Sequence, residues 1–185
     1  MNKTLCVCVV VALAMCAATA QTKTTMTGKC AKPSMEQKVP AGDKEGHAFM
    51  IAQGTCSVTG SVNGAVGKQG VFAEEVEATP DSIKNRGVYV VTFDSGDKVY
   101  YRYEGMATMK NDAYESGTNK YQIEGGTGKL QGIHGSGSCK LTGNSDGTLD
   151  YSCTGTYTMG MPTGNSSRGQ GRTPGTTKSP IHNPS

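Results

Sequence analysis

The sequence predicts an all-β fold in which about seven or eight antiparallel strands form a barrel or a sandwich. Three observations support this class. Short runs of β-branched and aromatic residues recur at even spacing, glycines and other turn residues separate them, and no segment has the periodicity of a long helix. Residues 125–158 are the clearest case, because glycines recur throughout them. Glycine weakens a strand, so this density indicates turns, bulges and sharp bends in a tightly wound sheet.

Residues 1–20 are predicted to be a secretory signal peptide. Lys3 precedes an apolar run, and small residues at Ala18 and Ala20 predict cleavage after Ala20. The run is too short for a permanent membrane anchor, so we expect no transmembrane segment and a secreted or periplasmic protein. A lipoprotein modified at Cys16 is the disfavoured alternative, because Met15 is a poor residue to precede a lipidated cysteine.

Composition divides the chain into four parts. The signal peptide (1–20) is followed by a polar lead-in (21–45), which contains two prolines and one short strand near Met26. Residues 46–158 hold the β-barrel domain. Residues 159–185 are rich in Gly, Pro and Ser and have almost no apolar side chains, so we expect a disordered tail.

The strands of the barrel domain are expected in the order in which strand-like and turn-like residues alternate. The clearest hairpin joins residues 87–93 to residues 98–106 through a turn that contains Gly96 and Asp97. Residues 107–117 are polar and are expected to connect two strands. The remaining predicted strands are 47–56, a short one within 57–70, 71–78, 119–124, and two between 129 and 158.

Two disulfides are predicted, because an exported mature chain would keep an even set of cysteines. A hairpin folded about Asp146 places Cys139 directly opposite Cys153, within the distance that a disulfide needs. Such a bond, closing a loop of about 15 residues, contributes roughly 3 kcal/mol. The pair Cys30–Cys56 follows by elimination.

Two segments resemble the signature motifs of the allene oxide cyclase barrel-like proteins, a group that includes dirigent proteins and small secreted bacterial proteins of unknown role. These are residues 93–105 (FDSGDKVYYRYEG) and residues 121–137 (YQIEGGTGKLQGIHGSG). The resemblance covers residues 46–158. It implies a calycin-like, eight-stranded antiparallel up-and-down barrel with a lumen, and association into homo-oligomers. The resemblance predicts no reaction for this chain, because the family's catalytic residues have no identifiable match in this sequence.

A ligand site is predicted on one face of the clearest hairpin. Barrels of this size either fill their interior with side chains or hold one small ligand. Alternation along the two strands places four aromatic residues on one face, and these would line an apolar lumen: Tyr89, Phe93, Tyr101 and Tyr103. The alternative is that the same aromatic residues simply form the core.

Glu104 and Glu124 are the only weak candidates for catalysis. Each has a polar neighbour at the next position of the same strand face, Arg102 and Gln122 respectively. Catalysis would need a titratable group whose pKa is shifted by burial or by a charge. Both glutamates fall on the predicted outer face, where solvated surface charge is the favoured interpretation.

Other chemistry is disfavoured by what the sequence lacks. His47 and His134 are isolated from paired carboxylates, and no CxxC occurs, so we expect no metal site. No phosphate loop or catalytic triad is recognisable, and no cofactor is expected. The formal net charge is only +3 and the basic residues are scattered, which argues against binding of nucleic acid.

Three functions follow from these patterns. The leading hypothesis is a non-enzymatic exported barrel that binds a small apolar ligand or a partner. The second is a cyclase-like or dirigent-like enzyme that confines a hydrophobic intermediate in the lumen, and the third is a structural or surface protein. A cavity large enough for a ligand would distinguish the first two functions from the structural one. A buried glutamate or tyrosine pointing into that cavity would favour the enzyme over the binder.

Overall fold

The structure, a computed structural model, describes residues 21–111 and 113–160. The predicted signal peptide and nearly all of the predicted tail lie outside these residues. The described chain forms a 10-stranded sheet and one short 3₁₀ turn, η1 (Gly128–Leu130). Its strands are β1 (Thr22–Cys30), β2 (Met35–Pro40), β3 (Ala48–Ser57), β4 (Thr59–Val62), β5 (Ala65–Ala78), β6 (Ser82–Phe93), β7 (Lys98–Lys110), β8 (Ala113–Gly126), β9 (Ile133–Gly143) and β10 (Leu149–Met159).

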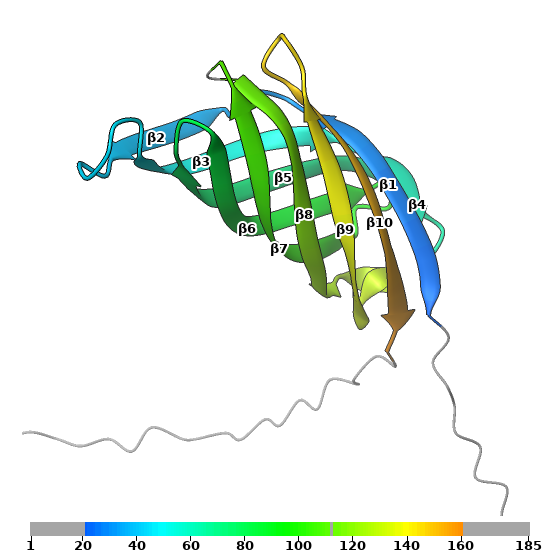
Figure 1. Ribbon diagram of the computed structural model, residues 1–185. Coiled ribbons are helices and arrows are strands. Elements are labelled where there is room, and N and C mark those ends of the chain that lie inside the picture. Colours follow the sequence, from blue (N-terminus) through cyan, green and yellow to red (C-terminus); the bar gives the residue numbers. More distant parts are fainter. Residues whose placement is uncertain (1–20, 112, 161–185) are drawn as a thin grey trace, which may run out of the picture.

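The strands pair so that the sheet closes on itself (Figure 1). β5 to β10 pair antiparallel as consecutive neighbours, and β10 pairs antiparallel with β1. β1 then returns to β5 through β4 and the last part of β3. Because β3 and β4 share one strand position, the ring has eight positions, which are β1, β3 with β4, and β5 to β10. The predicted eight-stranded up-and-down barrel is confirmed.

The segment predicted to be a polar lead-in instead supplies two strands. β1 pairs with β10 along its whole length, so the barrel begins at Thr22 and not at residue 46. Only Met26 and Cys30 of β1 are fully buried, which is why a strand rich in threonine and lysine looks polar in the sequence. β2 pairs with β3 alone and extends beyond the ring, with all of its residues exposed.

β7 and β8 are longer than the sequence predicts. The polar residues 107–117 contribute to both strands, since β7 runs to Lys110 and β8 begins at Ala113. Their outward side chains are polar, whereas Ala107 is buried and Tyr114 is half-buried toward the interior. The alternation between polar and buried residues is therefore present, but too few positions are apolar for the composition to reveal it.

Both predicted disulfides are present. β9 and β10 form a hairpin in which Cys139 lies opposite Cys153, so the predicted register is confirmed. Cys30 lies opposite Cys56 at the only position where β1 pairs with β3 within the described residues. The β1–β3 contact at Cys30–Cys56 is called the seam below.

The two ends of the barrel differ. At the end that carries the β6–β7 turn and η1, fully buried apolar side chains fill the interior: Val62, Val91, Phe93, Val99, Leu130 and Ile133. The opposite end carries the β2–β3, β5–β6, β7–β8 and β9–β10 connections, and there the interior opens to solvent. We call these the closed end and the mouth.

Several glycines make room for aromatic side chains of the interior. A Cβ on Gly137 or on Gly155, which lie opposite each other, would collide with the hydroxyl of Tyr121. A Cβ on Gly70 would likewise collide with the hydroxyl of Tyr89. These glycines do not have positive φ, so they serve the packing of tyrosines and not the bends that their density predicts.

Candidate ligand-binding lumen

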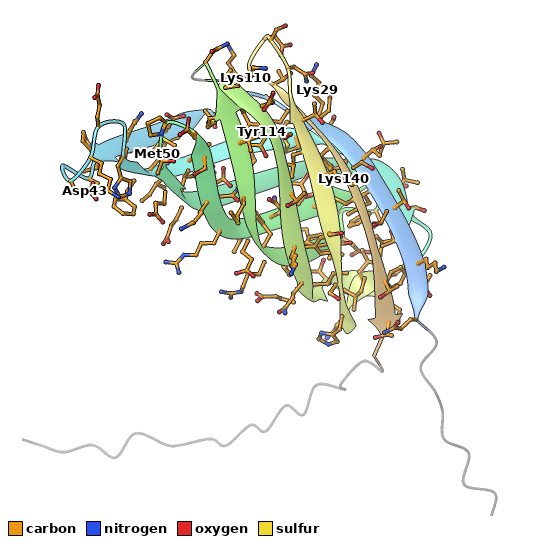
Figure 2. The ribbon with its side chains drawn as sticks, viewed as in Figure 1. Lys29, Asp43, Met50, Lys110, Tyr114 and Lys140 are labelled. Atoms are coloured by element: carbon orange, nitrogen blue, oxygen red, sulfur yellow. A yellow bond between two sulfur atoms is a disulfide. The ribbon has the colours of Figure 1, made fainter. Side chains whose placement is uncertain are left out.

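The barrel encloses a cavity of about 610 Å³ that opens at the mouth. Met50 on β3 and Tyr114 on β8 lie at this end of the barrel (Figure 2). A cavity of this volume falls in the range of small-molecule sites, which are mostly apolar with a few polar groups. The lumen has this character, because tyrosine, methionine, aliphatic and cystine side chains surround only a few charged or amide groups.

Four tyrosines form a connected cluster across the lumen. The ring of Tyr101 lies 6.2 Å from that of Tyr89 and 5.6 Å from that of Tyr121, the second pair edge to face. The ring of Tyr89 lies 6.4 Å from that of Tyr151, also edge to face. These separations lie within the range of favourable aromatic pairs. The cluster therefore gives the lumen a defined aromatic wall.

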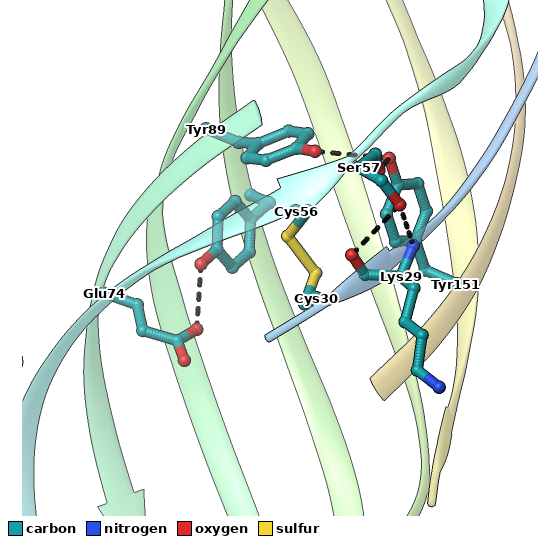
Figure 3. Close-up of a disulfide and its surroundings, with 8 residues drawn as sticks. Lys29, Cys30, Cys56, Ser57, Glu74, Tyr89 and Tyr151 are labelled. Atoms are coloured by element: carbon teal, nitrogen blue, oxygen red, sulfur yellow. Dashed lines mark hydrogen bonds between the residues drawn. A yellow bond between two sulfur atoms is a disulfide. The ribbon is translucent and has the colours of Figure 1, made fainter. Parts of the chain in front are cut away.

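Hydrogen bonds fix the orientation of two of these tyrosines (Figure 3). The hydroxyl of Tyr151 donates to the carbonyl oxygen of Ser57 at 3.0 Å. Because a phenol has one proton, the 3.2 Å contact between the Tyr89 and Tyr151 hydroxyls requires Tyr89 to donate. Burial raises the pKa of both phenols, so both are neutral at physiological pH.

Tyr101 differs from its neighbours in the cluster. Its side chain is only 5 % exposed, and its hydroxyl has no hydrogen-bond partner among the described residues. A buried hydroxyl without a partner costs free energy. Tyr101 lines the cavity through its ring, and its hydroxyl oxygen is shielded from the lumen by the surrounding side chains.

Glu74 on β5 places a carboxylate in the lumen. Its Oε2 atom accepts hydrogen bonds from the hydroxyl of Tyr103 at 2.8 Å and from Nδ2 of Asn85 at 2.7 Å (Figure 3 shows the contact with the tyrosine). No hydrogen bond to Oε1 and no salt bridge to Glu74 occur among the described residues. Burial raises the pKa of this carboxyl, although both hydrogen bonds oppose the rise.

The sequence analysis misses Glu74, as it misses Tyr121 and Tyr151 of the tyrosine cluster. The signal for Glu74 lies in the segment VFAEEVEA, where alternation places it on the same face as Phe72 and Val76. Both of those side chains line the lumen with it. The two consecutive glutamates conceal the pattern, because only the second of them, Glu75, points to solvent.

The predicted ligand residues divide between the lumen and the closed end. Tyr89, Tyr101 and Tyr103 line the cavity as predicted, and their contact with a ligand stays a prediction. Phe93 does not line it. This side chain is 1 % exposed and packs in the closed end, because it lies at the last position of β6 beside the turn.

The weak catalytic candidates lie outside the lumen. Glu104 and Glu124 are exposed on the outer face, and Oε1 of Glu124 lies 2.5 Å from Nε of Arg102. The hydrogen bond from Arg102 lowers the pKa of Glu124, as expected for a solvated surface pair. Of the two histidines considered in the sequence analysis, His134 is exposed. Nδ1 of His47 lies 2.6 Å from the Asp43 carboxylate near the β2–β3 turn.

Glu74→Gln is expected to change how stability depends on pH. The raised pKa of Glu74 in the folded state means that its stabilising contribution is complete below the unfolded pKa and is lost as pH rises through the folded pKa. Glutamine does not titrate, so the unfolding free energy of the variant relative to wild type should increase as the pH rises above the ordinary pKa of a glutamate and through the raised pKa of Glu74. Urea denaturation at several pH values measures this difference, and a constant or falling difference would contradict the burial of Glu74.

The described residues contain neither a metal-binding cluster nor a membrane-spanning helix. No cluster of three or more His, Cys, Asp or Glu side chains that could hold a metal ion occurs in residues 21–111 and 113–160. In the same residues, no helix has the length and apolar character needed to cross a membrane.

The fold and the cavity together define a class of protein: an antiparallel β-barrel with one closed end and a tyrosine-lined lumen open at the other. No protein-family model matches the chain, and no curated protein is similar to it. Among solved structures, the chain is similar to a pterocarpan synthase dirigent protein, with 13 % identity and a TM-score of 0.44. The match covers 76 % of this chain and 88 % of that protein. This likeness concerns the fold and carries no function to this chain.

Proposed function

We propose that this protein is an exported β-barrel that binds one small, mainly apolar ligand in its lumen without transforming it. The cavity of about 610 Å³ is the observation that supports this function. Its volume suits a drug-sized molecule, and its wall combines an apolar surface with a small number of polar groups. Two disulfides are consistent with an oxidising compartment, which agrees with export.

A purely structural barrel would not need this cavity. The closed end shows that the chain fills its interior where it has large aliphatic side chains, among them Leu130 and Ile133. Toward the mouth, the inward side chains stay half-exposed to the lumen, including Phe72, Tyr103 and Leu141. The difference between the two ends favours a binding function over a filled barrel.

A second candidate function is an enzyme that confines a hydrophobic intermediate in the lumen. Glu74 favours it, because a half-buried carboxyl with a raised pKa is suited to proton transfer. Tyr103, bonded to that carboxyl, would hold it in place. The binder and the enzyme predict the same cavity and differ in whether a bound molecule leaves unchanged.

Met50→Trp tests the binding function. Met50 lines the lumen near the mouth, whereas its neighbour Ile51 is 53 % exposed on the outer face. The uncharged dye N-phenyl-1-naphthylamine should bind wild type at a single saturable site, which fluorescence titration detects. Because tryptophan at position 50 fills the lumen, affinity should fall by about tenfold, or about 1.4 kcal/mol.

Ile51→Trp is the matched control and should leave the affinity for the dye unchanged, because its side chain points away from the lumen. Circular dichroism of both variants checks that each is folded. A wild-type protein that binds no dye, or equal losses in the two variants, would contradict a ligand site in the lumen. Native mass spectrometry of protein from its own source would then separate binder from enzyme by identifying the bound molecule.

A further inference from the structure

We infer that the ligand of this lumen carries a protonated amine, which pairs with Glu74 beside the tyrosine cluster. The inference rests on the proposed function and specifies the chemical class of the ligand. Two features of the lumen support it: a carboxylate without a cation, and aromatic rings around that carboxylate.

The carboxylate of Glu74 lacks a positive partner. Its two hydrogen-bond donors, Tyr103 and Asn85, are both neutral, and both contact Oε2. The other charged side chains that line the lumen are Glu36 and Lys38, which lie exposed on β2 at the mouth and form no salt bridge with Glu74 in the described chain. Glu74 is half-buried, and even a partly desolvated carboxylate without a cation is costly, so removal of that cost would favour a cationic ligand over a neutral one.

The surroundings of Glu74 suit an organic cation. Tyr103 bonds to the carboxylate. Tyr114 also lies near it, because burial and, to a smaller extent, the charge of Glu74 raise the pKa of Tyr114 to about 12. The rings of Tyr89 and Tyr101 follow deeper in the same cavity. Aromatic faces attract ammonium groups, and the attraction is strongest where water is excluded. An inorganic cation would gain little from this wall, because it needs several oxygen ligands.

The rest of the cavity indicates the body of the ligand. Beside Tyr151, the wall holds Met26 and the two disulfides, which offer apolar and polarizable surface. The ring of Tyr101, packed edge to face against the ring of Tyr121, adds aromatic surface to this wall. The lumen is therefore suited to an apolar, largely aromatic body with an ammonium group at Glu74.

Three probes with one hydrocarbon skeleton test the charge preference: 4-phenylbutylamine, 4-phenylbutan-1-ol and 4-phenylbutyrate. Each is measured by displacement of the naphthylamine dye at about pH 7.5, where the amine is protonated and the acid is ionised. The amine should bind about tenfold more tightly than the alcohol, and the acid more weakly than either. Glu74→Gln should abolish the advantage of the amine and leave the affinity for the alcohol unchanged.

Glu104→Gln, which removes an exposed outer carboxylate, is the matched control and should change none of the affinities. A second readout is the carbon-13 shift of the Glu74 carboxyl, whose pKa the bound amine should lower. Equal or tighter binding of the alcohol or the acid, or an amine advantage that survives Glu74→Gln, would overturn the inference. If the dye binds while no probe displaces it, the inference fails and the proposed function stands. If the dye itself does not bind, the proposed function fails as well.

Discussion

Replacing Cys30 and Cys56 together by alanine is expected to lower the free energy of unfolding by about 3.5 kcal/mol. The two cysteines are 26 positions apart, and the disulfide removes the entropy of that open loop from the unfolded chain. The bond also closes the seam, where β1 and β3 share a single pair of residues. Urea denaturation under non-reducing conditions gives the loss, and a change below about 1 kcal/mol would contradict it.

The double variant Cys139→Ala with Cys153→Ala is the control for this prediction. Its free energy of unfolding should fall by slightly less, about 3 kcal/mol, because the loop that this disulfide closes, of 14 positions, is somewhat shorter. The β9–β10 hairpin, however, keeps its register through pairs on both sides of the bond, from Leu149 with Gly143 to Met159 with Ile133. We therefore expect dye binding to weaken in the seam variant and to persist in the hairpin variant.

Gly155→Val is expected to destabilise the fold by about 3 kcal/mol, the upper part of the range for overpacked interiors. Any side chain at this position would collide with the Tyr121 hydroxyl and with the backbone of β9 at Ser136 and Gly137. The backbone cannot move without breaking the β9–β10 ladder, so the strain cannot be relieved by a change of rotamer. Thermal and urea denaturation measure the loss.

Two further variants define the cause of this effect. Thr154→Val changes the neighbouring outward position of β10 and should leave stability within about 0.5 kcal/mol of wild type. Tyr121→Phe removes the hydroxyl in the collision, so Gly155→Ala should be less damaging in that background than in wild type. Equal damage in both backgrounds would show that the hydroxyl of Tyr121 does not occupy the space above Gly155.

The fold could be predicted where local chemistry determined the pairing. The turn around Asp146 determined the register of β9 and β10, and with it the opposition of Cys139 and Cys153. The turn after Phe93 determined the β6–β7 hairpin in the same way. In both cases neighbouring strands are joined by a short turn, so sequence separation and spatial pairing agree.

The closure of the ring could not be predicted from the same rules. β1 pairs with β10, and the two strands stand at opposite ends of the described chain. The polar composition of β1 also hides its role in closing the ring, because glycine and threonine fill positions where a strand would usually show apolar residues. Gly28 must be small, since the Tyr151 hydroxyl occupies the space a side chain would take. Only the assembled barrel reveals this requirement.

The lumen was predicted in part. Alternation along β6 and β7 assigned Tyr89, Tyr101 and Tyr103 to one face, and all three line the cavity. It assigned Phe93 to the same face correctly, but alternation does not tell how far along the barrel axis a residue lies, and Phe93 packs in the closed end. Glu74 escapes prediction because the consecutive Glu75 conceals the alternation along β5, although the lumen itself holds a carboxylate.

The most direct test of the lumen as a ligand site is a crystal structure of the protein in complex with N-phenyl-1-naphthylamine. We expect density for one dye molecule inside the ring, against the rings of Tyr89 and Tyr101 and below the mouth at Met50. An interior filled by the protein's own side chains, or a dye bound only on the outer face, would contradict the account.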